Sequence, residues 1–502
     1  MSLISLTFAG FFIIVFALYF TCMKDHQWVL LLVSSLLFYA YAAPEYLIFL
    51  LISAVSTYLA AKGVLSAKSS ARKIYTGTLL LNLLILVAVK YLTWLLGCAG
   101  IKLTGFSMIV PLGISYYTFI VIGYLTDVWR GVIEPESNFL KYLTFVSFFP
   151  HITQGPINRF SDLAPRLFAR HEIDAERVKS GIYRIVCGLA KKLIIAERLS
   201  VYVDRVYAAP ASYDGLTLLA ASVFYAIQIY CDFSGYMDMV LGLSEMLGIK
   251  MAENFNLPYF AMSIAEFWRR WHITLGEWFK DYLYYSVLRS AAFKKLTKAM
   301  KKGKISFSKA TIRLVPTVLG LLITWAATGI WHGASWHYGF WGLYHGILII
   351  LSMILAGTFG KIKTSLHINE DKAGWKAFKI IRTFILVDIG YVFFRAPSVG
   401  ASLEIFKGII GRFSINASSI ANAILPFTED NTAVSYCLVV AIAILVLFIT
   451  DLAAFLKECP GDDFAGRYRM DSLGKYVFLG VMIVSIVLFG VFGQSSFIYM
   501  MY

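Results

Sequence analysis

Long apolar segments separated by short polar ones run along most of the chain. The clearest are residues 3–20, 28–43, 76–96, 434–450 and 476–492. A run of about 20 apolar residues, coiled as a helix, matches the thickness of the hydrocarbon core of a bilayer. The strands of a membrane barrel would instead alternate apolar and polar positions in short segments. The pattern therefore predicts transmembrane helices.

Composition supports this prediction. Of the 502 residues, 59% are hydrophobic and only 15% are charged, and the mean hydropathy is +0.71. A soluble domain cannot bury so much apolar surface. We expect an all-α polytopic membrane protein with about a dozen transmembrane helices by hydropathy.

Three stretches are too short, too broken or too charged to be simple spans. They are residues 139–157, 181–195 and 264–287. The first is interrupted by prolines and a glycine, and the second carries one arginine and two lysines among apolar residues. Irregular or charged segments are tolerated at membrane depth only where protein or a wet cavity surrounds them. We expect re-entrant and interfacial helices that line a central cavity.

The net charge of +15 changes the picture little. Basic residues gather in loops, and residues 289–313 hold nine of them without an acid. The tendency of basic loops to stay on the cytoplasmic side of a membrane explains this excess, so no nucleic-acid partner is expected. Such a positive field would also attract an anionic substrate from the cytoplasm.

An aromatic stripe lies in residues 266–287, "EFWRRWHITLGEWFKDYLYYSV". Apolar side chains recur there at three- and four-residue steps: Trp268, Trp271, Leu275, Trp278, Phe279 and Tyr282. Charged side chains lie on the other side of this helical wheel: Arg269, Arg270, Glu277, Lys280 and Asp281. An interfacial helix with arginines reaching the headgroups and a functional helix both fit. His272 lies at the rim of the apolar stripe, where an imidazole needs a partner, and this favours a function.

A second histidine follows an apolar segment directly. Residues 316–331 are apolar enough to span, His332 comes next among small residues, and another apolar run begins at residue 340. Ionisable groups near the membrane plane are functional candidates. A neutral imidazole can take a proton from an alcohol and return it to a leaving group. Transfer of an acyl group from a thioester to a hydroxyl needs such a base, together with a donor to the oxyanion.

Other roles for the polar residues remain open. His332, His337 and His345 lack the i, i+4 spacing and the nearby acid of common zinc sites, so we expect no metal. His337 is typical of a loop or interfacial residue, and His345 of a packed histidine that supports His332. Asp232, Asp238 and Glu245 are candidate intramembrane carboxylates, and we expect either helix–helix hydrogen bonds or a role in ion coupling or cavity polarity. A secondary transporter with these groups as a proton relay is one alternative, although no inverted repeat is visible. A membrane scaffold is another.

Four stretches resemble the membrane-bound O-acyltransferase family, and most closely its bacterial branch of alginate O-acetyltransferase-like proteins. They are "FFPHITQGPINRF" (148–160), "EFWRRWHITLGEWFKDYLY" (266–284), "GIWHGASWHYGFWGLYHG" (329–346) and "FIYMMY" (497–502). The stretches stand in the family's order over nearly the whole chain. The two tryptophan–histidine motifs together are the specific part of the resemblance.

The resemblance implies a ring of membrane helices around a tunnel that joins the cytoplasm to the outer face. One membrane domain would occupy residues 1–502, with N-terminal spans in 1–130, a catalytic core in 139–346 and C-terminal spans in 347–502. His332 matches the family's near-invariant histidine, and we expect it to be the general base. His272 matches the second histidine of the bacterial branch, and we expect it to be an orienting or electrostatic partner.

The resemblance also implies the substrates and their surroundings. Trp268, Arg270, Trp271 and Trp331 would shape the tunnel, and Lys280 with the basic block would attract the donor. The donor would be a thioester from the cytoplasm, acetyl-CoA or an acyl carrier protein, and no bound cofactor is expected. The acceptor would be a hydroxyl of an exported cell-surface polysaccharide, reached alone or through an extracytoplasmic transfer partner. The protein would be a multi-pass protein of the cytoplasmic membrane. Transfer of D-alanine to teichoic acid is the alternative within this family. The D-alanine transferases share both motifs but are typically shorter than this chain.

Overall fold

The computed structural model describes residues 2–42, 44–67, 69–101, 111–302, 308–427, 433–457 and 466–492. These residues form helices joined by loops, and they contain no named strand. The chain divides into two compact units. The first unit comprises Met1–Glu197, Tyr230–Glu253 and Pro460–Tyr502, and the second comprises Arg198–Ile229 and Asn254–Cys459. The division of residues 1–502 into three consecutive segments of one domain stays a prediction.

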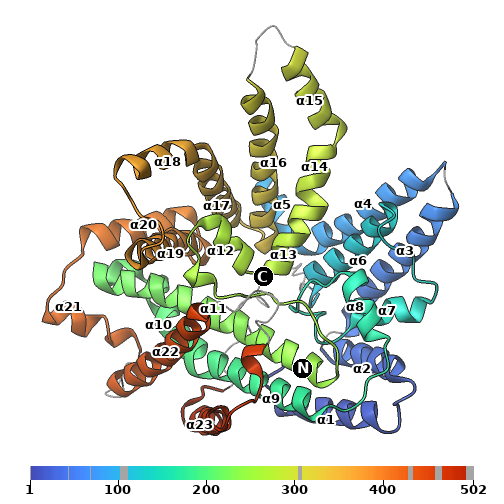
Figure 1. Cartoon of the computed structure of the whole chain (residues 1–502), viewed down its shortest axis with the longest axis horizontal. Helices are drawn as coiled ribbons and strands as arrows, with labels where there is room; N and C mark the ends of the chain where they lie inside the picture. Colours follow the sequence, from blue (N-terminus) through green and yellow to red (C-terminus); the bar gives the residue numbers. More distant parts are fainter. Residues whose placement is uncertain are drawn as a thin grey trace. The chain divides into compact units, whose positions relative to one another are not determined.

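Helices of the first unit are shown in blue to green, and in red, in Figure 1. They are α1 (Leu6–Phe20), α2 (Gln27–Ala42), η1 (Pro44–Tyr46), α3 (Leu47–Ser66), α4 (Ala71–Lys90), α5 (Leu92–Cys98), α6 (Ile114–Trp129), α7 (Phe139–Ser147), α8 (Phe160–Leu167), α9 (Ala175–Ala190), the π-helix η2 (Lys191–Ala196) and α23 (Leu473–Phe489). The long helix α11 (Gly215–Met246) contributes its C-terminal part to this unit.

The second unit takes the two helices directly before α11, the N-terminal part of α11 and the helices between Asn254 and Cys459. They are α10 (Glu197–Ala208), η3 (Pro210–Ser212), η4 (Pro258–Phe260), α12 (Ile264–Arg270), α13 (Ile273–Trp278), the π-helix η5 (Phe279–Tyr284), α14 (Tyr285–Arg289), α15 (Ala291–Lys302), α16 (Lys309–His332), α17 (Trp336–Ile354), α18 (Ala356–Ser365), α19 (Ala373–Arg395), α20 (Val399–Gly411), α21 (Ala417–Asn422), η6 (Leu425–Phe427) and α22 (Ala433–Leu456). Within it, α15 packs along α16 to form a two-helix arm (Figure 1).

Among the described residues, six helical stretches are long and apolar enough to cross a membrane. They are Pro44–Ser66, Ala71–Lys90, Gly215–Met246, Thr311–His332, Trp336–Ile354 and Val434–Leu456. The last of these has a mean hydropathy of 2.8 with only 11% of its residues buried, as expected of a helix that faces lipid. The all-helical, multi-pass class is confirmed. The predicted dozen spans and the central tunnel are not confirmed.

The three unusual stretches have different outcomes. The first is broken as predicted, because α7 ends at Ser147 and irregular backbone follows to residue 159. Residues 181–195 contain no break, since α9 continues into η2, and their re-entrant or interfacial position stays a prediction. The charged side chains of this stretch form ion pairs with carboxylates of α11. Protein therefore compensates these charges while the helix stays continuous. In the third stretch the apolar stripe is confirmed by burial of Trp271, Leu275 and Phe279, but the single helix is interrupted between α12 and α13.

Glycines bring neighbouring helices into backbone contact in both units. In the first, a β-carbon on Gly188 would lie 2.5 Å from the carbonyl oxygen of Gly235, where α9 crosses α11. In the second, a β-carbon on Gly342 of α17 would lie 2.2 Å from the carbonyl oxygen of Trp325 of α16. Small residues permit such close crossings between membrane helices. The α16–α17 contact fixes the turn that follows His332.

Candidate functional site

The break between α12 and α13 has a tertiary cause. Segment 254–256 pairs antiparallel with the chain around Trp271. The Asn256 N–H donates to the Arg270 carbonyl at 2.9 Å, and the Ile273 N–H donates to the Asn254 carbonyl at 3.1 Å. These bonds replace helical ones, so the helix ends at Arg270 and a new one begins at Ile273.

His272 occupies this break in a left-handed conformation, with φ of 48°. That conformation is uncommon for residues with a β-carbon, and it persists only where the surroundings impose it. The side-chain oxygen of Asn254 provides part of the restraint, because it accepts bonds from the Thr274 N–H at 3.0 Å and from the Thr274 hydroxyl at 2.8 Å. The His272 ring is thereby held in one direction, and the residue is only 2% exposed.

His332 is the last residue of α16, and it is 3% exposed. Its ring centroid lies 4.8 Å from that of Trp331, 5.0 Å from Trp341 and 5.3 Å from Phe394. The Trp331 ring also lies 6.2 Å from the His272 ring. The structure therefore brings His272 and His332 against the same tryptophan.

His345 extends this group of rings. It is fully buried, and its ring lies 5.3 Å from Trp341 and 5.0 Å from Trp268. Neither of its ring nitrogens has a hydrogen-bond partner among the residues that the structure describes. Gly390 of α19 packs on it, since a β-carbon there would lie 2.5 Å from its Nε2 atom. We call His272, His332, His345, Trp268, Trp331, Trp341 and Phe394 the histidine–tryptophan cluster.

Burial keeps the cluster's first histidine uncharged. Loss of hydration lowers the pKa of His272 from 6.5 to about 3, so its imidazole is neutral at any physiological pH. A neutral imidazole carries one N–H donor and one basic nitrogen. Such a ring can donate a hydrogen bond, accept one, or move a proton between the two sites.

The remaining predicted site residues differ in their burial and in their partners. Trp271 is buried and stacks on Phe267. Arg270 is bound to Glu266, with 2.9 Å between Nη2 and Oε1, and donates to the Asn256 carbonyl at 3.2 Å. Lys280 is exposed. His337 belongs to the first turn of α17 and has its Nδ1 atom 2.8 Å from the Ser335 hydroxyl.

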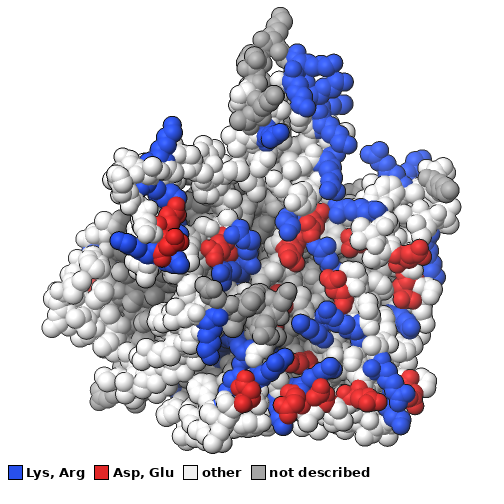
Figure 2. Space-filling view, in the orientation of Figure 1, with Lys and Arg blue, Asp and Glu red and all other residues white. Residues whose placement is uncertain are grey.

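The basic block is largely an exposed face of α15. Figure 2 shows its lysines gathered along the two-helix arm. The less exposed side chains of α15 are Phe293, Leu296, Thr297 and Met300. Residues 303–307 of the block lie outside the described residues, as does the stretch 497–502. Any attraction of this face for an anionic donor stays a prediction.

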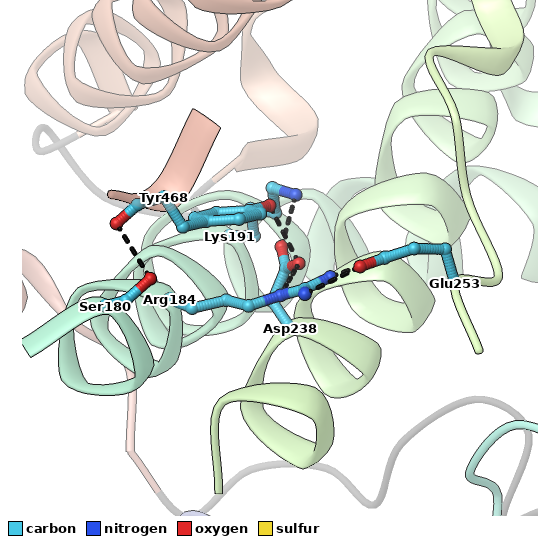
Figure 3. A network of polar contacts seen from close by, with 6 residues as sticks. All are labelled: Ser180, Arg184, Lys191, Asp238, Glu253 and Tyr468. Carbon is cyan, nitrogen blue, oxygen red and sulfur yellow. Dashed lines mark hydrogen bonds and ion pairs between the residues drawn. The ribbon is translucent and has the colours of Figure 1, made fainter. Parts of the chain in front are cut away.

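Two of the three candidate carboxylates, Asp238 and Asp232, are ion-paired in the first unit. Asp238 of α11 accepts from Lys191 Nζ at 2.7 Å, Arg184 Nε at 3.2 Å and the Tyr468 hydroxyl at 2.8 Å (Figure 3). Arg184 in turn donates to both carboxylate oxygens of Glu253, at 2.8 and 2.6 Å. These contacts join α9, η2 and α11, as the helix–helix alternative predicts.

A second buried group repeats this arrangement in the same unit. Lys192 Nζ lies 2.6 Å from Asp232 Oδ1 and 2.7 Å from Glu197 Oε1, and all three side chains are 2% exposed. Paired in this way, buried charges retain the hydrogen bonds that they would otherwise lose on leaving water.

Known proteins resemble the chain over most of its length. A sequence model of the MBOAT, membrane-bound O-acyltransferase family, matches residues 73–300. The probable alginate O-acetylase AlgI of Pseudomonas aeruginosa is 32% identical over 440 residues, which cover 84% of this chain and 77% of that protein. The chain belongs to the membrane-bound O-acyltransferase family. The predicted enzyme class, an O-acyltransferase, is confirmed, and the transporter and scaffold alternatives are set aside.

Two further relatives show the range of this O-acyltransferase family. The peptidoglycan O-acetyltransferase of Helicobacter pylori is 28% identical over 438 residues, covering 80% of this chain and 77% of that protein. The teichoic acid D-alanyltransferase of Streptococcus thermophilus is 28% identical over 304 residues, covering 57% of this chain and 69% of that protein.

Sequence reasoning missed three residues of the acyltransferase's cluster and its support. Trp341 precedes His345 by four residues, so both lie on one face of a helix, and this spacing could have identified it. Asn254 and Phe394 have no such signal, because each acts on residues far from it in sequence. Only the packed structure reveals their roles.

Proposed function

We propose that this O-acyltransferase moves an acetyl group from a cytoplasmic thioester to a hydroxyl of an exported cell-surface polysaccharide, with the histidine–tryptophan cluster as its reacting centre. The observation that supports this most is the shared contact of His272 and His332 with the Trp331 ring. Two buried imidazoles held on one aromatic side chain provide a proton acceptor and a hydrogen-bond donor in one place.

His332 is the general base of the proposed reaction. Its basic nitrogen takes the proton of the acceptor hydroxyl while the oxygen attacks the thioester carbonyl. The new carbon–oxygen bond forms, the carbon–sulfur bond breaks, and the imidazolium returns the proton to the departing thiolate. Aromatic rings around the imidazole exclude water, which would otherwise hydrolyse the thioester.

His272 is the orienting and electrostatic partner. Its burial and low pKa keep it neutral, so one ring nitrogen carries a proton that can be donated to the oxyanion of the tetrahedral intermediate. The strained backbone at this residue, fixed by Asn254, supports such a role, since a preorganised donor costs no reorganisation during the reaction.

Six further residues support the reaction in this proposal. His345 and Trp268 pack on Trp341, which contacts His332 and so supports its ring. Trp331 and Trp271 enclose the reacting centre. Arg270, tied to Glu266, rigidifies the end of α12. Lys280 and the basic face of α15 attract the anionic donor, acetyl-CoA or an acyl carrier protein, from the cytoplasm.

The setting of the proposed reaction is the cytoplasmic membrane, crossed several times. The donor arrives from inside, and the acceptor is a polysaccharide or an extracytoplasmic protein that completes the transfer to it. Acetylation of polysaccharide is favoured over D-alanine transfer to teichoic acid by the extent of similarity. The acetylase relative covers 84% of this chain, against 57% for the D-alanyltransferase.

The decisive experiment replaces His332 by Ala in cells and measures ester groups on the envelope. Mild alkali releases the esters, and mass spectrometry identifies them as acetyl or D-alanyl. Loss of a general base should lower esterification by about 10²- to 10⁴-fold at normal membrane levels of the protein. His337→Ala is the matched control, because that histidine lies in the first turn of α17 and shares a hydrogen bond with the Ser335 hydroxyl. Esterification at the parental level in His332→Ala would refute the assignment.

A further inference from the structure

Two buried glutamines of the first unit differ sharply in their hydrogen bonding. Gln27 is 5% exposed, and its amide is fully engaged: Nε2 donates to the carbonyls of Tyr19 at 3.2 Å and His171 at 2.8 Å, and Oε1 accepts from the His171 N–H at 2.8 Å. Gln154 is 2% exposed, yet neither side-chain atom has a partner among the residues that the structure describes. A buried polar group without a partner is costly and calls for a ligand or a water.

The segment that carries Gln154 is buried and held by hydrogen bonds. Residues 148–158 have irregular backbone and are all buried, although loops normally lie on surfaces. Irregular backbone in a membrane protein is tolerated where it lines a cavity or is enclosed by protein. The Phe149 N–H donates to the Ser35 hydroxyl at 3.0 Å, which fixes the start of the segment.

The neighbours of Gln154 on both sides are hydrogen-bonded. Thr153 shares a hydrogen bond with the Tyr236 hydroxyl, which also bonds the main chain of Gln154. Asn158 Oδ1 accepts from the Ala252 N–H at 3.2 Å, and its amide nitrogen lies 3.3 Å from His151 Nδ1. These bonds engage Thr153 and Asn158, whereas the Gln154 carboxamide and the Nε2 atom of His151 have no hydrogen-bond partner among the described residues.

The chemistry of a carboxamide indicates what would bind. It offers two N–H donors and one carbonyl acceptor, and it bears no charge. A secondary amide, with its own N–H and C=O, uses both kinds of site without introducing a charge. Thioester donors of both expected types, coenzyme A and carrier protein, hold the acyl group on the same pantetheine arm, an extended chain with two secondary amides.

We propose that Gln154 is a binding residue for an amide of the pantetheine arm of the acyl donor. This inference rests on the proposed use of a thioester donor, and it does not depend on the role of His332. The carboxamide replaces the water that a pantetheine amide loses on entering the protein. A donor that lacks such an arm would gain nothing from Gln154.

The test compares Gln154→Met with Gln27→Met, both of which exchange a glutamine for an apolar side chain of similar length. The purified variants in nanodiscs are given acetyl-CoA, an acetylated carrier protein, or S-acetyl-2-mercaptoethanol, which has no amide. For Gln154→Met, the ratio of kcat/KM for either pantetheine donor to that for the amide-free donor should fall about tenfold, the loss of two ordinary hydrogen bonds. Its melting temperature should stay the same or rise, because an unsatisfied amide is removed.

Gln27→Met should show the opposite pattern, with a lower melting temperature and an unchanged donor ratio. Binding of non-reactive coenzyme A, measured by calorimetry, gives a readout without catalysis, and it should weaken in Gln154→Met alone. If Gln154→Met behaves like Gln27→Met, with lost stability and an unchanged ratio, then Gln154 binds only a structural water and the proposal fails. A failed His332→Ala test would leave the calorimetric result standing, so the two proposals can fail separately.

Discussion

The two units bury polar side chains in opposite ways. In the first, Arg184, Lys191 and Asp238 are charged and paired, with atoms 2.7 to 3.2 Å apart across α9, η2 and α11 (Figure 3). In the second, His272 and His332 are surrounded by aromatic rings. A paired buried charge has its partners and resists change, whereas a neutral imidazole retains a proton to donate and a lone pair to accept one. The ion-paired network of the first unit is therefore suited to hold helices together. The imidazoles of the second unit are suited to transfer protons.

The largest effect on stability is expected where the ion pairs are broken. Asp238→Ala would leave Lys191 and Arg184 buried without one of their counter-charges, at a cost of about 3–5 kcal/mol. The yield of folded protein from membranes and its melting temperature both measure this loss. Glu176→Ala is the control, since Glu176 pairs with Lys179 on an exposed part of the same helix α9. Equal stability of the two variants would show that the network is not a framework.

A smaller loss is expected where the cluster is supported by helix packing. Gly342→Ala places a β-carbon 2.2 Å from the Trp325 carbonyl, so α16 and α17 must separate, at about 1–3 kcal/mol. Gly339→Ala on the same helix meets its nearest neighbour only at 3.9 Å and should be neutral. Thermal unfolding in detergent measures both variants. Acyl transfer should fall with Gly342→Ala and not with Gly339→Ala, and the same response from both would contradict the close crossing.

The effect that is smallest at neutral pH is that of His272, because it develops only on acidification. The pKa of His272 is about 3 in the folded protein and about 6.5 once it is hydrated, so the unfolded state binds a proton first as the pH falls. Stability from this residue is therefore complete above pH 6.5 and is lost as the pH falls towards 3, by about 2 kcal/mol at pH 5. His272→Asn should flatten the loss of melting temperature between pH 7 and pH 5. An unchanged slope would mean that this histidine is hydrated.

The sequence pattern predicted what depends on local periodicity. Apolar runs located the helices, and the three- and four-residue spacing placed Trp271, Leu275 and Phe279 on a buried face. It did not predict the break at His272, because the hydrogen bonds that cause it come from Asn254, which precedes the stripe and carries no helix-ending signal. Tertiary contacts of this kind leave no pattern in the sequence around the residue that they affect.

The charged residues allowed a less accurate prediction than the apolar residues, because their partners are also distant in sequence. Arg184, Lys191 and Lys192 indicated a re-entrant or interfacial helix, but the pattern did not predict their partners on α11 and at Glu253, which lie 40 to 69 residues later in the chain. Of the proposed reacting centre, His332 and Trp331 are adjacent and His272 stands in a recognisable motif, so the sequence predicts all three. It does not predict Phe394, since this residue contacts His332 from a helix some 60 residues away.

The central claim is that the histidine–tryptophan cluster, and not the ion-paired network, holds the reacting atoms. An electron cryomicroscopy structure in nanodiscs with a non-hydrolysable analogue of the acetyl thioester tests it directly. The account predicts the analogue's carbonyl within about 3 Å of a His332 or His272 ring nitrogen, the range of a hydrogen bond. A His332 ring that faces the acyl chains of the lipid, with the analogue bound elsewhere, would contradict it.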